Sequence, residues 1–165
     1  MNEQGKILLV DDNDINLNIL KIILEDDYEL CSASNGVQAL EVLENFHPDL
    51  ILLDILMPRM SGYELCQSLR EDSDYNNIGI IMVSAKAMQN EKLKGYRCGA
   101  NDYITKPFDA DELHAKVDVF IKFKARNEKA RFRNELRLMH SHEVSSPGNL
   151  LTPVLKKAEK NKGLT

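Results

Sequence analysis

The chain has 165 residues, of which 43% are apolar and 28% charged, and its formal net charge is −5. These values indicate a globular protein with one domain of ordinary core size and a small additional segment. The longest apolar run, Leu50 to Met57, is interrupted by Asp54 and is far shorter than the roughly 20 residues that cross a bilayer, which excludes a membrane span. The apolar run near the amino terminus is too short for a secretion signal, so we expect a cytoplasmic protein.

The charge is distributed unevenly along the chain. Residues 1–124 hold 12 Lys and Arg against 22 Asp and Glu, whereas residues 125–165 hold 9 against 4. This shift predicts an acidic globular domain over 1–124 and a basic helical extension with a flexible tail over 125–165. An acidic domain repels phosphates, which argues against direct nucleic-acid binding. The three cysteines lack the spacing of a metal site, so we interpret them as reduced, mostly buried thiols.

Short apolar runs alternate with stretches of helical spacing. The apolar runs predict five strands, at 7–10, 30–33, 50–53, 78–83 and 103–104. The first predicted helix has one apolar face made of Ile15, Ile19, Ile22 and Ile23. The second and third are marked by Val37, Leu40, Val42 and Leu43, and by Tyr63, Leu65, Cys66 and Leu69.

The last two predicted helices differ in strength. The fourth, around 86–96, is only weakly amphipathic. The fifth begins near Asp109, which can cap its first turn, and it presents Leu113, Val117, Phe120 and Phe123.

Five strands alternating with five helices predict an α/β fold, a doubly wound parallel sheet with right-handed crossovers. Five such units fit the flavodoxin-like strand order 2-1-3-4-5, flanked by the five helices. In such sheets ligands bind at the carboxyl ends of the strands, where the order reverses between the first and third strands. We therefore expect the functional site at that edge.

Four of the five predicted strands lead into residues with reactive or charged side chains. Asp11 and Asp12 follow the first strand, Asp54 the third and Ser84 the fourth, while the fifth leads to Lys106. Three neighbouring carboxylates repel one another unless a cation lies between them. Mg²⁺ binds oxygen ligands and keeps waters for a phosphate. Each residue alone has an ordinary explanation as a cap, strand end, loop charge or turn hydroxyl, but these explanations do not account for their joint placement.

The segments VDDN, LLDILMPRMSG, VSA and ITKPF, in this order and spacing, resemble the receiver domain of two-component response regulators over about residues 5–124. The resemblance implies a phosphorylation-activated switch in a phosphorelay, which catalyses only its own phosphorylation and dephosphorylation and is no enzyme on an external substrate. It implies that Asp54 is the phosphoacceptor. It also implies that Mg²⁺ is held by Asp11, Asp12, Asp54 and the backbone carbonyl of Leu56.

The resemblance assigns roles to the remaining site residues as well. Lys106 would neutralise phosphoryl oxygens, and the peptide bond before Pro107 would be cis. Ser84 would move to hydrogen-bond the phosphate, and Tyr103 would then turn inward, although Tyr103 also fits a plain half-buried strand residue. Ser61 stands where the family often has an acidic residue, and it can cap the third helix.

The same resemblance implies partners. The phosphodonor would be a histidine kinase or a histidine phosphotransfer protein. Phosphorylation would change the face formed by the fourth helix, the fifth strand and the fifth helix, and so regulate a partner or attached output whose identity stays open. A homodimer through this face, or through the extension of the fifth helix, is left open too.

The extension offers two weaker patterns. SHEVSSP resembles the phosphoacceptor-histidine box of sensor kinases, with His142 in the histidine position, but its flanks depart from the box and few residues follow. We interpret it as a degenerate linker, and 41 residues fall below the usual size of an output domain. Phe132, Leu136 and Met139 have the spacing of a coiled-coil seam, but this seam is short, so our default interpretation is a solvated basic helix.

Alternative functions have specific counter-indications. A phosphatase of the haloacid-dehalogenase type has a second Asp two residues after its nucleophile, where this chain has Leu56. A nucleotide-binding protein needs glycines after the first strand, and VDDNDIN has none. Two alternatives remain, a receiver that binds partners without phosphate and an amino-terminal fragment of a larger hybrid signalling protein.

Overall fold

The structure is a computed structural model that describes residues 4–85 and 88–144, with the side chains of 140–144 outside the description. Its elements are β1 (Lys6–Val10), α1 (Asp14–Leu24), β2 (Glu29–Ala33), α2 (Gly36–Leu43), β3 (Leu50–Asp54), α3 (Gly62–Glu71), β4 (Gly79–Ser84), α4 (Gln89–Arg97), β5 (Asp102–Thr105) and α5 (Ala110–Val144). The chain divides into two units, Met1–Lys124 and Ala125–Thr165. None of the helices in the described ranges is both long and apolar enough to span a bilayer.

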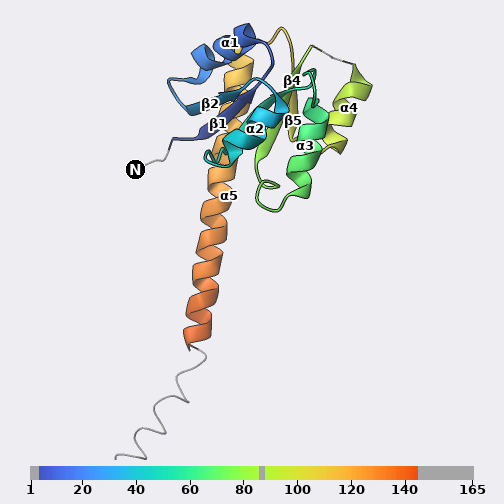
Figure 1. Cartoon of the computed structure of the whole chain (residues 1–165). Coiled ribbons are helices and arrows are strands. Elements are labelled where there is room, and N and C mark those ends of the chain that lie inside the picture. Colours follow the sequence, from blue (N-terminus) through green and yellow to red (C-terminus); the bar gives the residue numbers. More distant parts are fainter. Residues whose placement is uncertain (1–3, 86–87, 145–165) are drawn as a thin grey trace, which may run out of the picture. The chain divides into compact units, whose positions relative to one another are not determined.

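The five strands form one parallel sheet in the order β2-β1-β3-β4-β5 (Figure 1). This confirms the predicted fold class and strand order. Val10 of β1 pairs with Leu53 of β3, and Asp54 pairs with Val83 of β4. Ser84 pairs with Thr105 of β5. Because the strands are parallel and in this register, the residues that follow β1, β3, β4 and β5 emerge at the same edge of the sheet.

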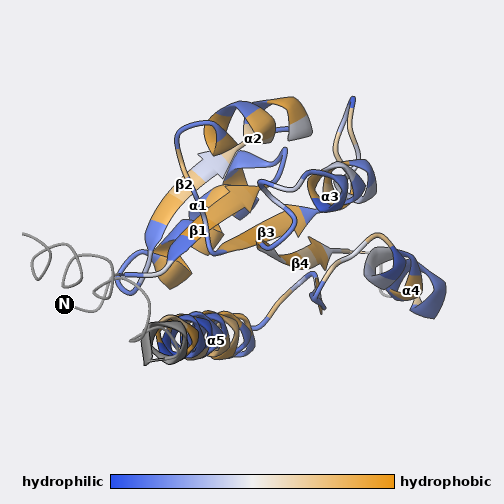
Figure 2. Cartoon of the chain, turned by 90° about the horizontal axis from the view of Figure 1, so that it is seen from below, coloured by the Kyte–Doolittle hydropathy of each residue, from blue (hydrophilic) through white to orange (hydrophobic). Residues whose placement is uncertain are grey.

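Apolar side chains fill both faces of the sheet. β1, β3 and β4 are buried almost throughout, as expected for central strands of a parallel sheet, and Figure 2 shows them as the most hydrophobic elements. One face packs against α1 and α5 through buried side chains that include Leu17, Leu20, Leu113 and Val117. The other face packs against α2 and α3, through Ala39, Leu43, Leu65, Cys66 and Leu69 among others.

The predicted apolar face of α1 is mostly wrong, because Ile23 is the only one of its four residues that packs against the core. Ile15 and Ile22 are 68% and 71% exposed, whereas Leu17, Leu20 and Leu24 are buried. Both sets recur at helical spacing, about half a turn apart, so α1 is apolar on two opposite sides and periodicity cannot choose between them. The helix buries its leucines because of the direction in which the chain leaves β1.

Two other apolar residues lie outside the core against expectation. Val37 at the start of α2 is 46% exposed, and Phe123 in α5 is 61% exposed. In α2 the buried positions are Gly36, Ala39 and Leu43, and Leu43 is the only one of them that was predicted. In both helices the apolar run is longer than the stripe that meets the sheet, so its ends remain in solvent.

The predicted helix starts at Ser61 and Asp109 agree with the structure. The Ser61 side chain accepts from the backbone N–H of Glu64, and the Glu64 carboxylate accepts from the backbone N–H of Ser61, which makes a complete capping box. The Asp109 carboxylate accepts from the backbone N–H of Glu112 at 2.9 Å. α4 begins at Gln89, later than predicted, and has no side-chain cap at Met88.

Candidate functional site

Three aspartates meet at the carboxyl edge of the sheet. Asp11 and Asp12 follow β1, and Asp54 is the last residue of β3. One carboxylate oxygen from each lies within 4.8 Å of the other two. Asp11 and Asp54 are only 2% and 6% exposed, whereas Asp12 is open to solvent. The structure therefore brings together the three carboxylates that the sequence predicted, with one of them accessible from outside.

Lys106 supplies a positive charge inside this group. Its Nζ donates to Asp11 Oδ2 at 2.6 Å and to Asp54 Oδ1 at 3.3 Å. Its backbone N–H donates to the carbonyl of Ser84 at 2.8 Å, which ties the loop after β5 to the end of β4. The peptide bond between Lys106 and Pro107 is cis, as the resemblance implies. The shorter distance to Asp11 was not expected, because the sequence reasoning paired Lys106 with the phosphoryl group on Asp54.

The capping explanation for Asp11 and Asp12 is contradicted by the structure. Asn13 caps α1, and its side chain accepts from the backbone N–H groups of Ile15 and Asn16. Asp11 instead accepts from the backbone N–H of Asn13 at 2.9 Å and from the Asn16 side-chain amide at 3.2 Å. Asn16 is a positioning residue that sequence reasoning missed. Its only signal was its place in the first turn after an acidic strand end.

The pKa of Asp54 is raised to about 6, mainly by burial; the ammonium of Lys106 opposes this rise, and the neighbouring carboxylate of Asp11 contributes to it. One ammonium therefore does not fully balance the carboxylates at this edge. A second cation beside them would lower the pKa of Asp54 and keep its carboxylate ionised. Such a cation would also keep Asp54 available as a nucleophile.

The donor set fits a hard divalent cation. Mg²⁺ binds oxygens at about 2.0–2.1 Å, so ligand oxygens on opposite sides of it are about 4 Å apart. Three carboxylates whose oxygens lie within 4.8 Å of one another can adopt this geometry with small side-chain movements. Leu56 has an exposed apolar side chain without a ligand atom, so only its backbone carbonyl could contribute.

The loop between β3 and α3 packs closely against the backbone of Asp54. The backbone N–H of Gly62 donates to the carbonyl of Ile55 at 2.9 Å, which closes the loop. A Cβ on Gly62 would lie 2.2 Å from the carbonyl oxygen of Asp54. Only glycine therefore fits this close approach, and the loop fixes the position of the Asp54 backbone.

Ser84 and Tyr103 lie together on the inner side of the β4–β5 edge. Ser84 is fully buried and Tyr103 is 5% exposed, so the half-buried interpretation of Tyr103 is wrong. Burial raises the pKa of Tyr103, and a side-chain hydrogen bond with Ser84 acts against that rise. The tyrosine is thus in its inward position and in contact with the serine.

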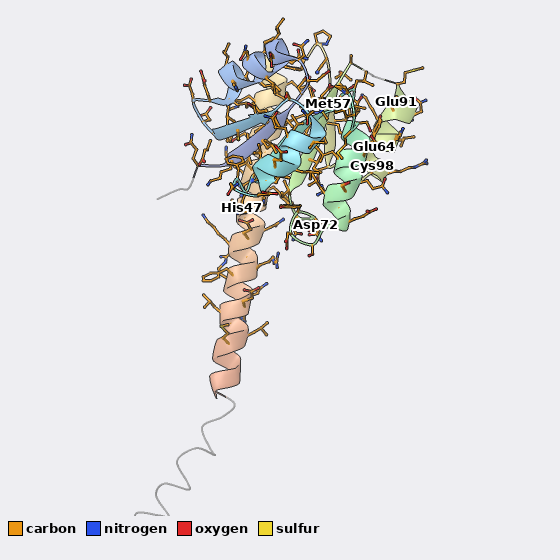
Figure 3. All side chains as sticks on the ribbon, viewed as in Figure 1. His47, Met57, Glu64, Asp72, Glu91 and Cys98 are labelled. Carbon is orange, nitrogen blue, oxygen red and sulfur yellow. The ribbon has the colours of Figure 1, made fainter. Side chains whose placement is uncertain are left out.

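α4 is attached to the domain mainly through polar contacts. The Tyr63 hydroxyl donates to Glu91 Oε2 at 2.7 Å (Glu91 is labelled in Figure 3). The ammonium of Lys94 lies 4.4 Å from the Tyr63 ring centroid, and that of Lys92 lies 5.6 Å from the Tyr103 ring centroid. Gly95 is the only buried residue of α4. Few buried apolar contacts make a helix easy to shift.

His142 lies in the last turn of α5, and its side chain falls outside the described residues. Residues 145–147 of the same motif also lie outside them. The interpretation of SHEVSSP as a degenerate linker stays a prediction.

Comparisons with known proteins agree with one another. The family model for the response regulator receiver domain matches residues 7–118. The probable transcriptional regulator ycf27 of Porphyridium aerugineum is 37% identical, covering 81% of this chain and 54% of its own. The DNA-binding dual master transcriptional regulator RpaA of Synechocystis is 33% identical, covering 79% of this chain and 55% of its own. The chain thus spans about half the length of these curated relatives.

Solved structures show the same likeness. A putative response regulator from Chloroflexus aurantiacus has a TM-score of 0.70 and 32% identity, covering 73% of this chain and 99% of its own. A CheY-like receiver domain protein from Methanospirillum hungatei has a TM-score of 0.70 and 29% identity, covering 76% and 99%. These matches therefore extend over almost the whole length of those structures.

Proposed function

Because the chain belongs to the receiver-domain family of two-component response regulators, whose general function is that of a phosphorylation switch, we propose that Asp54 accepts a phosphoryl group from a phosphohistidine. The observation that carries this proposal is the buried carboxylate of Asp54, which lies beside two further aspartates and the ammonium of Lys106. The donor is a histidine kinase or a histidine phosphotransfer protein. The chain acts on no external substrate.

In the proposed transfer, an oxygen of the Asp54 carboxylate attacks phosphorus, a P–O bond forms, and the P–N bond to the donor imidazole breaks. The imidazole leaves with the electron pair of that bond. Lys106, which lies 3.3 Å from Asp54, stabilises the negative charge on the transferred oxygens. Asp11 holds the Lys106 ammonium in place at 2.6 Å. A bound Mg²⁺ supplies charge neutralisation of the phosphoryl oxygens.

Asp12 is the acidic residue whose removal tests the metal site most cleanly, because it is exposed and its loss leaves the buried contacts intact. We expect Asp12→Ala to weaken Mg²⁺ binding at least about tenfold, since one charged ligand of three is lost. Phosphoryl acceptance from acetyl phosphate should then need correspondingly more Mg²⁺. Calorimetric titration and intact-mass kinetics measure the two effects.

Asp14→Ala is the matched control for Asp12→Ala, because Asp14 is an exposed carboxylate two residues further along that lies outside the cluster. It should bind Mg²⁺ as the wild type does. If Asp12→Ala and the wild type bind Mg²⁺ with equal affinity, Asp12 is not a ligand of the metal.

We further propose that phosphorylation acts on the face formed by α4, β5 and the part of α5 in the first unit. The phosphoryl oxygens compete with the Tyr103 hydroxyl for Ser84, because a hydrogen bond to an anion is stronger than one to a neutral hydroxyl. Tyr103 also contacts Lys92 of α4 through its ring, so a change at Ser84 can pass to that helix. The result is a shift between two populations of the domain.

Amide hydrogen exchange with beryllofluoride, a phosphoryl mimic, measures this shift. We expect protection to change over residues 88–105 and to stay constant in α1 and α2. Asp54→Asn, which cannot hold the mimic in the same way, is the control and should show no change. Changes confined to α1 and α2 would contradict the proposed path.

The relative named RpaA is described as DNA-binding, and that description belongs to a longer protein, only 55% of which is matched by this chain. We expect no direct nucleic-acid binding by residues 1–124, because 22 acidic residues outnumber 12 basic ones there. The output partner and a cytoplasmic location remain predictions.

A further inference from the structure

The part of α5 beyond Lys124 presents apolar side chains to solvent. Phe132 is 62% exposed, Met139 65% and Leu136 39%, and they follow one another at intervals of four and three residues. All three lie on the helix that runs to Val144. Figure 3 shows side chains standing out from this part of the helix. An exposed stripe of large apolar residues at this spacing is typical of a helix that packs against another helix.

The stripe belongs to a heptad pattern, written abcdefg. When Leu136 takes position a, Lys129 falls at the preceding a. The d positions are then Ala125, Phe132 and Met139. These five residues, defined here as the extension seam, lie within the second unit of the chain. A single lysine at an a position reduces the stability of a coiled coil, and it fixes the register and number of strands.

Charges beside the seam indicate the orientation of the partner helix. The e positions hold Arg126 and Arg133, and the g positions hold Glu128 and Glu135. In a parallel pair, each g residue faces the e residue five positions further along the partner, so Glu128 would meet Arg133 of the second copy, twice by symmetry. In an antiparallel pair, e faces e and g faces g, which would place arginine against arginine and glutamate against glutamate.

We propose that residues 125–139 form a parallel two-stranded coiled coil with the same segment of a second copy of this chain. Self-pairing follows from the charges, because one helix carries both halves of the complementary pair. The seam is about 22 Å long at 1.5 Å per residue, so the dimer is weak and depends on concentration. This proposal does not rest on the phosphorylation of Asp54.

Sedimentation velocity of the full chain over a concentration series tests the association. The average mass should rise from that of the monomer toward twice that value. Phe132→Glu places a charge in the seam and should raise the dimer dissociation constant at least about tenfold. Asn134→Glu makes the same charge change at the outward f position and should leave the constant unchanged. A wild-type chain that stays monomeric throughout, or two variants with equal effects, would overturn the proposal.

Disulfide trapping tests the orientation. Phe132→Cys and Leu136→Cys proteins are mixed and oxidised, and their covalent dimers are separated by intact mass. A parallel pair gives 132–132 and 136–136 dimers, whereas an antiparallel pair, in which an a residue faces a d residue of the partner, gives mainly the mixed 132–136 dimer. Asn134→Cys and the parent chain, with its three native cysteines, set the background. Predominance of the mixed dimer, or yields no higher than background, would overturn the parallel arrangement.

Discussion

Replacing Gly62 by alanine is expected to lower the free energy of unfolding by about 2–4 kcal/mol. A Cβ at this position would lie 2.2 Å from the carbonyl oxygen of Asp54 and 2.9 Å from the Cα of Ile55. Both are backbone atoms at the end of a buried strand, so neither can move without displacing β3. Helix propensity alone predicts the opposite sign, because alanine favours a helix over glycine by about 1 kcal/mol. Urea unfolding of the two proteins measures the difference.

Gly36→Ala is the matched control, because Gly36 is also the first residue of a helix, α2. A Cβ there would meet the side chain of Met60, with its Sδ at 2.7 Å, and a flexible methionine can move aside. We expect a change within about 1 kcal/mol of zero. If Gly62→Ala and Gly36→Ala lower the free energy of unfolding equally, the close approach of Gly62 to the Asp54 backbone does not determine stability.

Asp54→Asn is expected to stabilise the metal-free protein at pH 8 by roughly 2–3 kcal/mol. Burial raises the pKa of Asp54 from 3.8 to about 6, so ionising it in the folded protein costs stability. The stabilisation that comes from protonated Asp54 is complete below pH 3.8 and is lost as the pH rises through about 6. The advantage of the variant should therefore be large at pH 8 and shrink at pH 5.

Urea unfolding at both pH values, with and without Mg²⁺, tests this prediction. Mg²⁺ should stabilise the wild type more than the variant at pH 8, because the cation offsets the buried carboxylate. Asp26→Asn removes an exposed carboxylate just after α1 and should change stability by less than about 0.5 kcal/mol. A variant less stable than wild type at pH 8 without metal would contradict the account of the site.

The sheet and the position of the site could be predicted from sequence because both depend on short-range patterns. Short apolar runs of two to six residues between helical stretches predict a parallel sheet. Once the order 2-1-3-4-5 is assumed, the residues after each strand share one edge. Asp11, Asp54 and Ser84 were placed correctly by that argument alone.

The parts that were missed depend on side-chain directions, which no local pattern contains. α1 has apolar residues on two sides, and only the path of the chain decides that Leu17 is buried and Ile15 exposed. Lys106 contacts Asp11 from the loop after β5, and Asn16 contacts the same carboxylate from the first turn of α1. The contact between Tyr63 and Glu91 joins α3 to α4, and the two residues are 28 positions apart in sequence.

The central claim is that Asp54 is the residue that accepts the phosphoryl group. Intact mass of the wild type and Asp54→Asn, after incubation with acetyl phosphate and Mg²⁺, tests it most directly. An amide is a poor nucleophile, so the wild type should gain a base-labile adduct of ~80 Da and the variant should gain none. The same adduct on Asp54→Asn would show that another residue is the acceptor.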